Sequence, residues 1–318
     1  MRDALAGNDR AVLIDFPHHS NVGDSAIWLG ERRALRELGV TVPYACSLGT
    51  WNVRAARAAV GDGVVLLHGG GNFGDVWPAH QQFREHVIAT MRDKRVIVLP
   101  QTIHFSSDEA MRRAANALGT HPDITVLVRD RPSRGAAERL GVNTVLCPDP
   151  AFALGALRRR APVQPQIWLL RTDAEAIDHP ASVPEGVVPV DWLRPGSTSA
   201  LRRGPITVGR VAFSAGRRLD RVLVAGPLRG DLSWRSFDRI AREHLHRGAR
   251  LVSDGNVVVT DRLHGHILCL LLGIPHVVLD NHYGKLRRFI EAWTHESPLV
   301  RTAESTEQAA EIAAELGG

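Results

Sequence analysis

The sequence predicts an α/β protein of two units that face each other, each built on a parallel sheet. Apolar strand-like segments alternate with helix-like segments along both halves of the chain, and near-continuous apolar strands are typical of parallel sheets covered on both faces. A length of 318 residues suits two domains. The stretch "GALRRRAPVQP" at 155–165 breaks the alternation with basic residues and prolines, which is typical of a linker.

The first half carries the clearer alternation of elements. Strands are expected at 11–16, 41–45, 64–68, 95–100, 124–130 and 144–150. Helices are expected at 24–39, near 78–92, near 108–118 and at 133–140. Asp24 is the expected N-cap of the first helix, and Gly39 is its expected C-terminal stop.

The second half resumes the alternation after the linker. Strands are expected near 166–170, 187–190, 206–212, 221–225, 250–253, 257–260 and 276–279. Helices are expected at 233–247, with Ser233 as a cap, and at 264–273, 284–293 and 304–316. The predicted domains are therefore 1–155 and 166–300, each Rossmann-like, followed by a C-terminal helix within 301–318. Ligands of open α/β sheets bind beyond the carboxyl ends of the strands.

Composition narrows the class of partner. The net charge is +5, and a basic surface attracts phosphates, nucleic acid or anionic lipid. Aromatic residues make up only 5% and do not interleave with the basic runs, which argues against nucleic acid. The chain has neither an apolar run of about 18 residues nor a signal-peptide pattern, so a cytoplasmic location is expected. Three separated cysteines without a CxxC pair, Cys46, Cys147 and Cys269, are expected to be buried packing residues.

Two polar segments follow strands of the first half. "PHHSNVGDSA" at 17–26 contains Asn21 and Asp24, and a carboxylate that caps a helix can still face a ligand. "HGGGNFGD" at 68–75 has the spacing G-x-G-x-x-G, but the next predicted strand ends without an acid, so a dinucleotide site is not expected. We interpret the segment as a binding loop, because three glycines, Gly69–Gly71, allow backbone N–H groups to approach a ligand.

Two further segments carry arginine at a strand end. Arg129 in "VLVRDRPS" is either an anion clamp, an exposed arginine or the partner of Asp130. In "VVTDRLHGH" at 258–266, Arg262 and His264 lie at a strand-to-helix turn, where an arginine fork and helix N–H groups suit a phosphate. His264 and His266 are two residues apart and do not share a helix face, which argues against a metal pair. His266 is equally well explained as a packed core histidine.

Taken in order, "NVGDSAIWLG", "LHGGGNFGD", "LPQTIHF", "VRDRPS", "CPDPAF" and "VVTDRLHGHILCLLLGIPHVVLDNHYGK" resemble the polysaccharide pyruvyl transferase family. The resemblance implies a GT-B-like fold, with two Rossmann-like domains facing across a cleft, and no cofactor or metal. It implies phosphoenolpyruvate as donor, a sugar acceptor and a cyclic pyruvate ketal as product. For donor binding, the resemblance implies Arg129 and the motif Arg262, Leu263 and His264. The reaction also needs an acid and a base, for which His264 and Asp24 are the candidates. The other candidate substrate-binding residues are Gly69, Gly70, Gly71, Asn72, Asn21 and Lys285.

Other interpretations stay open from the sequence. The helix at 284–293 has one apolar and one basic face, so it either packs on the core or lies on a membrane surface, which suits a lipid-linked acceptor at the inner face of the membrane. A GT-B glycosyltransferase that uses a nucleotide sugar is one rival function, because fold does not determine function. A non-catalytic module that binds anionic glycans or lipids is the other.

Overall fold

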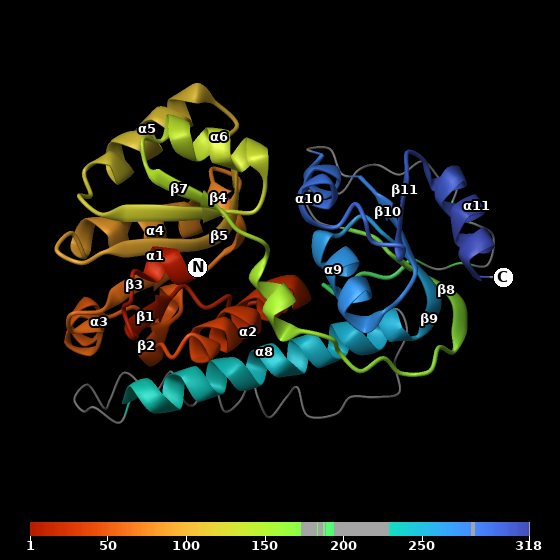
Figure 1. The fold of residues 1–318 in the computed structure, drawn as a ribbon, viewed down its shortest axis with the longest axis horizontal. Coiled ribbons are helices and arrows are strands. Elements are labelled where there is room, and N and C mark those ends of the chain that lie inside the picture. The colour runs from red at the N-terminus through yellow and green to blue at the C-terminus, as the bar shows by residue number, and fades with distance from the viewer. Residues whose placement is uncertain (173–182, 184–186, 188, 194–228, 281–283, 318) are drawn as a thin grey trace. The chain divides into compact units, whose positions relative to one another are not determined.

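A computed structural model describes residues 1–172, 183, 187, 189–193, 229–280 and 284–317 (Figure 1). The chain forms two compact units. The first unit comprises Met1–His19, Ala26–Leu154 and Arg288–Trp293, and the second comprises Ser20–Ser25, Gly155–Arg287 and Thr294–Gly318. The strands predicted at 206–212 and 221–225 lie outside the described residues.

A seven-stranded parallel sheet forms the first unit. Its strands are β1 (Arg10–Ile14), β2 (Thr41–Cys46), β3 (Val64–Leu67), β4 (Gly70–Gly74), β5 (Val96–His104), β6 (Ile124–Val128) and β7 (Asn143–Leu146). Their order is β2-β1-β3-β5-β6-β7, with β4 paired to β5 beyond the end of β3. The order reverses between β1 and β3, which pair in register as Leu13 with Leu66 and Ile14 with Leu67. Such a reversal is the point where open α/β sheets bind ligands.

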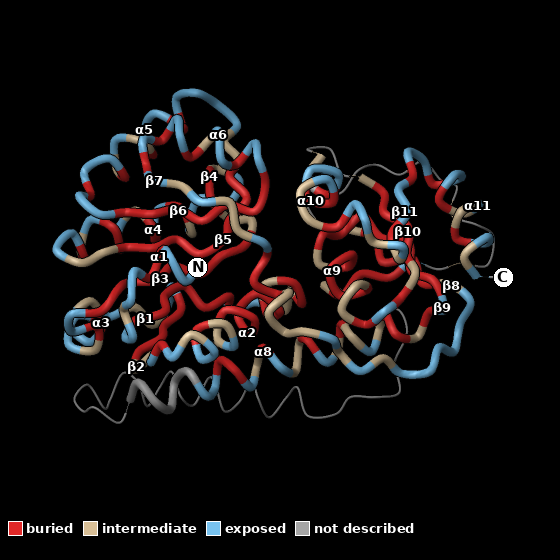
Figure 2. Tube along the Cα trace, viewed as in Figure 1, coloured by how far each residue is buried: buried red, intermediate tan, exposed pale blue. Residues whose placement is uncertain are grey.

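Helices cover the first sheet. They are α1 (Arg2–Leu5), α2 (Val22–Glu37), α3 (Val53–Val60), α4 (Pro78–Thr90), α5 (Asp108–Gly119) and α6 (Arg131–Arg139), with 3-10 turns at Leu48–Thr50 and Pro150–Leu154. One apolar cluster joins side chains of α3 to α6 with Val12 and Ile14 of β1 and their counterparts on neighbouring strands. The alternate strand residues, such as Leu13 and Ile97, are equally buried (Figure 2). Both faces of the sheet are therefore covered, as the apolar strands predict.

The second unit has a four-stranded parallel sheet. Its strands are β8 (Gln164–Leu169), β9 (Gly255–Thr260), β10 (His276–Leu279) and β11 (Val300–Ala303), in the order β11-β10-β9-β8. Its helices are α8 (Arg229–Ser253), α9 (Leu263–Leu272), α10 (Lys285–Trp293) and α11 (Thr306–Gly317); α10 continues into the first unit. Ala309 and Ala313 of α11 pack on Val257 and Val259, which point to one face of the sheet. Gly265 of α9 lies close to the side chain of Thr260, which points to the opposite face. The predicted parallel α/β class is confirmed.

Several predicted elements differ from the structure. The strand predicted at 250–253 is wrong, because these residues end α8, a helix of 25 residues whose buried face includes Val252. Ser233 therefore lies inside α8 rather than at its start. The strand predicted at 187–190 is represented, among the described residues, by a single bridge between Val190 and Leu169. Four elements are not predicted from residue spacing, because they are short or rich in alanine, arginine or glycine: α1, α3, β4 and β11.

Candidate active site

The carboxyl ends of β1 and β3 carry buried polar side chains at the point where the strand order reverses. Glu31 of α2 is fully buried and accepts hydrogen bonds from His68 Nδ1 (2.7 Å) and from the Gly69 N–H (2.8 Å). His68 directly follows β3, and its ring lies 5.9 Å from that of Trp28. The carboxylate thus fixes both the imidazole and the first glycine of the glycine run.

Asp15 follows β1 in a left-handed conformation, with φ of 76°. In a regular strand, side chains alternate between the two faces of the sheet, so the Asp15 side chain would point to the same face as Leu13. It points instead toward α4, where His80 Nδ1 lies 3.0 Å from Asp15 Oδ2. A non-glycine residue in this region costs about 1 kcal/mol and is held by its surroundings. Asp15 is buried and the His80 ring is about one quarter exposed, so the pair presents an oriented imidazole edge to solvent.

Asn72 is oriented by two donors. Its Oδ1 accepts from Arg84 Nη2 (2.6 Å) and from Gln101 Nε2 (3.2 Å). Because a guanidinium can only donate, the amide oxygen must point inward and the Nδ2 donors must point away from Arg84. Arg84 is fully buried over the Phe73 ring, and burial lowers its pKa to about 10, so it stays cationic at neutral pH. Asn72 is therefore positioned as a hydrogen-bond donor.

The glycine run does not form the predicted loop, because Gly70–Gly74 is strand β4 and the next helix begins only at Pro78. A Cβ on Gly69 would lie 2.6 Å from the Pro100 carbonyl oxygen, and Gly70 has a φ of 124°. Close backbone packing thus explains Gly69, and backbone conformation explains Gly70. A Cβ on Gly71 would meet only Arg129 Nη2, at 3.6 Å. The structure therefore brings Gly71 and Arg129 together.

Arg129, directly after β6, is buried rather than exposed. Its Nη1 lies 2.6 Å from Asp149 Oδ2, and its Nη2 donates to Thr102 Oγ1 (2.9 Å). The alternative of an Arg129–Asp130 pair is wrong, because Asp130 instead caps α6 by accepting from the Ser133 N–H (2.8 Å). Two partners hold the guanidinium in one orientation, which is what a bidentate anion contact requires.

The turn between β9 and α9 forms as predicted in the second unit. Arg262 is the N-cap residue of α9, and Leu263 and His264 form its first turn. The Arg262 side chain is only 4% exposed, and its Nη2 lies 2.8 and 2.7 Å from the two oxygens of Asp191. Its guanidinium carbon lies 5.5 Å from the centre of the Trp192 ring. The Arg262 guanidinium is thus held through Nη2 by the Asp191 carboxylate, and it lies beside the Trp192 ring.

His264 packs against the start of α2. A Cβ on Gly23 would lie 2.4 Å from His264 Nδ1 and 2.5 Å from Cγ, so the imidazole rests on the Gly23 backbone. Asn21 precedes α2, accepts from the Gly23 N–H (3.1 Å) and donates to Asp24 Oδ2 (2.8 Å). The cap predicted at Asp24 is therefore provided by Asn21, and α2 begins two residues earlier than predicted. The half-buried Asp24 and His264 lie on adjoining first turns.

The His266 side chain is a packed core histidine, as one of the two interpretations expects. His276 Nδ1 lies 2.9 Å from the Ile274 carbonyl oxygen and must donate to it. His276 Nε2 then accepts from His266 Nδ1 (2.7 Å), and His266 Nε2 accepts from Thr294 Oγ1 (3.0 Å). Burial lowers the pKa of His276 to about 4 and that of His266 well below its ordinary value. Both rings are neutral at pH 7, so neither serves as an acid.

Helix α10 packs on the protein. Leu286, Phe289 and Ile290 are buried while Arg287 and Arg288 are exposed, which confirms the core-facing interpretation of this helix. Lys285 begins α10, and its side chain lies outside the described residues. No helix in the described part of the chain is both long and apolar enough to cross a membrane.

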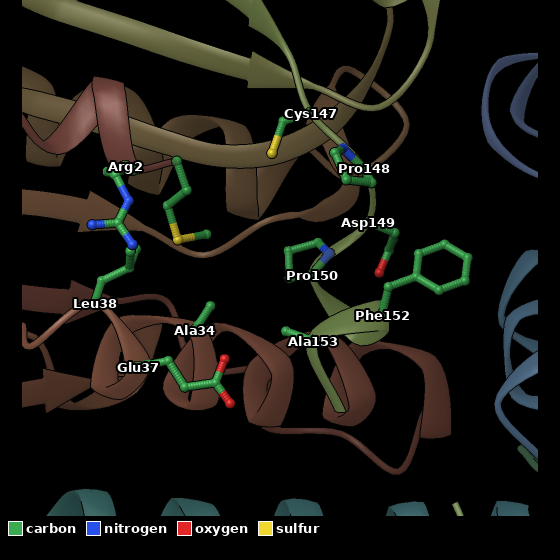
Figure 3. A pocket seen from close by; sticks show the side chains of 11 residues that line it. Arg2, Ala34, Glu37, Leu38, Cys147, Pro148, Asp149, Pro150, Phe152 and Ala153 are labelled. Atoms are coloured by element: carbon green, nitrogen blue, oxygen red, sulfur yellow. The ribbon is translucent and has the colours of Figure 1, made fainter. Parts of the chain in front are cut away.

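The first unit contains a pocket. Figure 3 shows it lined by the chain start, the end of α2 and the segment 147–153. Asp149 is its link to the candidate site, through Arg129. Cys147 lines the pocket and is half-buried, whereas Cys46 and Cys269 are buried, so the expectation for the cysteines is confirmed for those two. Burial raises the pKa of the Cys147 thiol, which keeps it in the less reactive protonated form.

Sequence reasoning missed several residues that hold the predicted ones in place. Asp15 had a detectable signal, because it is an acid at the end of an apolar strand. Asp149 lies in the "CPDPAF" motif, but nothing there indicates that its partner is Arg129. Glu31 and Asp191 had no signal, because a helix and an irregular segment far along the chain supply them.

The order of these motifs and their placement at strand ends agree with the comparison to known families. A family model described as polysaccharide pyruvyl transferase matches residues 21–283. The chain belongs to the polysaccharide pyruvyl transferase family. The match includes the start of α2, the glycine run, Arg129 and the β9–α9 turn.

Relatives in the family span most of the chain. Pyruvyl transferase 1 of Schizosaccharomyces pombe is 29% identical over 304 residues, which cover 92% of this chain and 71% of that protein. EpsO of Bacillus subtilis, named as a candidate pyruvyl transferase, is 27% identical over 302 residues, or 94% of this chain and 90% of that protein. A crystal structure of a functionally uncharacterized Klebsiella pneumoniae protein has a TM-score of 0.61 at 16% identity, covering 96% of this chain and 95% of its own. That likeness concerns the fold alone.

Proposed function

We propose that the protein transfers pyruvate from phosphoenolpyruvate to two hydroxyls of one sugar, forms a cyclic pyruvate ketal and releases phosphate. The acceptor sugar belongs to a polysaccharide, an oligosaccharide or a lipid-linked glycan. Membership of the polysaccharide pyruvyl transferase family supports pyruvyl transfer and a sugar acceptor.

The observation that carries the proposal is the β9–α9 turn. Arg262 and His264 lie within three residues, at the start of a ten-residue helix. The first N–H groups of a helix have no partners within the helix, and its dipole favours an anion there. An arginine fork, helix N–H groups and an imidazole together match a phosphate ester, which carries its charge on several oxygens.

The reaction needs a proton donor close to the bound phosphate ester. His264 donates a proton to the CH₂ carbon of phosphoenolpyruvate, and the C=C electron pair forms the new C–H bond. A sugar hydroxyl then bonds to the electrophilic C2 and loses its proton. The C2–O bond to phosphate breaks with its electron pair, and phosphate leaves as an anion. The second hydroxyl then bonds to C2 to close the ketal, and its proton returns to the imidazole of His264. General acid catalysis of this kind contributes about 10²–10⁴-fold.

The remaining assignments come from the family resemblance, from the needs of the reaction and from the sequence pattern, and they stay predictions. Arg129 contacts the donor, the glycine run and Asn72 line the substrate site, and Asp24 takes the hydroxyl proton. Roles for Asn21 and Lys285, the GT-B-like arrangement around a cleft, the cytoplasmic location and contact with a lipid-linked acceptor at the membrane are also predictions. The orientation of the Asn72 amide supports its role, because its donors are directed away from Arg84.

The test is incubation of the purified protein with phosphoenolpyruvate and a panel of glycosides. The expected result is phosphate release together with a product heavier than the acceptor by pyruvate less water. Thermal unfolding with phosphoenolpyruvate or UDP-glucose supplies a donor control, because a ligand that binds the folded state raises the melting temperature. Protection by UDP-glucose alone, or no phosphate release with any acceptor, would refute the proposal.

A further inference from the structure

Asp191 lies outside every motif that points to function, yet its carboxylate accepts several hydrogen bonds beside the β9–α9 turn. Its two oxygens accept from Arg262 Nη2, from the N–H (3.0 Å) and hydroxyl (2.6 Å) of Thr172, and from the Leu193 N–H (2.9 Å). Asp191 is buried, with a side chain only 2% exposed. The donors come from three separate parts of the chain.

Asp191 and two of its donor residues follow three neighbouring strand ends. Thr172 follows β8, Asp191 follows the bridge of Val190 to Leu169, and Arg262 follows β9. The carboxylate therefore joins adjacent ends of one parallel sheet at the edge where ligands of such folds bind. The backbone partners fix Asp191 independently of Arg262, so Asp191 can set the orientation of the arginine.

The charge of Asp191 acts against donor binding. Phosphoenolpyruvate carries a phosphate and a carboxylate, and a buried negative charge beside the arginine repels both. A carboxylate at this position therefore weakens donor binding, so donor binding alone does not explain the presence of Asp191. An oriented guanidinium is useful in a different way, because preorganised charges stabilise the transition state more than the ground state.

We propose that Asp191 is a positioning residue that locks the Arg262 guanidinium for turnover at the expense of donor affinity. This inference rests on the proposed function. The Trp192 ring is buried and lies beside the same guanidinium. Removing the Asp191 charge therefore lowers kcat and lowers KM for phosphoenolpyruvate, whereas loss of folded protein would leave KM unchanged and lower the apparent kcat only by the unfolded fraction, which urea unfolding measures.

The experiment compares Asp191→Asn with Asp254→Asn, a matched change just before β9, at the amino end of the same sheet. We expect Asp191→Asn to lower kcat by roughly 10- to 100-fold, the scale of a small misplacement of a catalytic group, while KM for phosphoenolpyruvate falls. Asp254→Asn should match the wild type in both constants. A normal kcat, or a KM that does not fall, would overturn the inference.

A double-mutant cycle with Arg262→Ala identifies the route of the effect. If Asp191 acts through Arg262, Asp191→Asn changes kcat no further once the arginine is gone. Additive losses would overturn the inference. Should Asp191→Asn fail to fold, Thr172→Val removes one hydroxyl donor to Asp191 and is expected to lower kcat with KM unchanged; a normal kcat there also overturns it. A wild-type protein that releases no phosphate refutes the proposed function and this inference together.

Discussion

Replacing Gly23 by alanine tests whether the place of His264 is what the chemistry needs. The added Cβ would lie 2.4 Å from Nδ1, 2.5 Å from Cγ and 2.9 Å from Cβ of His264. Rotation of the imidazole alone cannot relieve the last of these contacts, because the His264 Cβ is fixed to the backbone of α9. The side chain or the helix start must therefore move by about 1 Å to reach ordinary van der Waals contact.

A shift of that size is expected to lower turnover by about 10²-fold. Stability should change much less, because overpacking costs about 1–3 kcal/mol and alanine regains about 1 kcal/mol over glycine within a helix. The assay is phosphate release from phosphoenolpyruvate with an accepting glycoside, together with urea unfolding. Gly135→Ala in α6 is the control, because its Cβ would have nothing within 4 Å and it should leave turnover unchanged.

Normal turnover of the Gly23→Ala protein would refute the reasoning, since either His264 tolerates displacement or it takes no part in the reaction. Glutamine at position 264 separates these outcomes. An amide still donates to phosphate but is not an acid, so His264→Gln should retain donor binding and lose most of the chemical step. Retained turnover in both variants would place the acid elsewhere.

Three further changes have defined outcomes. Arg262→Ala should cost about 3 kcal/mol of transition-state stabilisation in kcat/KM, and Arg262→Lys should also be poor because the planar fork is lost; near-normal values would remove Arg262 from the site. Burial lowers the pKa of His276 from 6.5 to about 4, so the folded state binds a proton less readily than the unfolded state. The stabilisation from the neutral ring is therefore complete above pH 6.5 and is lost as the pH falls toward 4. The free energy of unfolding in urea should drop by about 2 kcal/mol from this group alone between pH 7.5 and 5, with a further loss from His266, and a flat profile would contradict it. Gly69→Ala should destabilise the fold by about 2 kcal/mol through its approach to backbone oxygen, whereas Gly71→Ala should unfold at nearly wild-type urea concentration; equal midpoints would show that the two sites do not differ in packing.

The β9–α9 turn could be predicted because its information is local. Strand, arginine, histidine and apolar helix follow one another within fifteen residues, so their geometry is determined by secondary structure alone. The partner of Arg262 could not be predicted, because Asp191 lies 71 positions away and reaches the turn only through the pairing of Val190 with Leu169. Contacts of this kind depend on tertiary structure that spacing does not encode.

Glycines and long helices produced the main errors in the elements. The three glycines predicted a binding loop, because they allow backbone N–H groups to approach a ligand, but Gly70–Gly74 pair with β5 and Gly69 packs closely on Pro100. The apolar residues at 251–252 predicted a strand, yet they complete the buried face of α8. Tertiary packing decided both cases, and local propensity was only a weak guide.

The first unit is discontinuous in sequence, because residues 288–293 belong to it. This affects which fragments of the chain can fold and when the unit can fold during translation. Phe289 stacks on Phe152 with ring centres 6.1 Å apart and planes 4° from parallel, and Trp293 Nε1 donates to the Arg129 carbonyl oxygen (2.7 Å). Both aromatic residues belong to the first unit although they follow most of the second. A fragment that stops at Leu154 would therefore expose the Phe152 ring and lose the donor to Arg129. On the ribosome, likewise, the first unit emerges early but cannot complete its own packing until residue 293 has been synthesised.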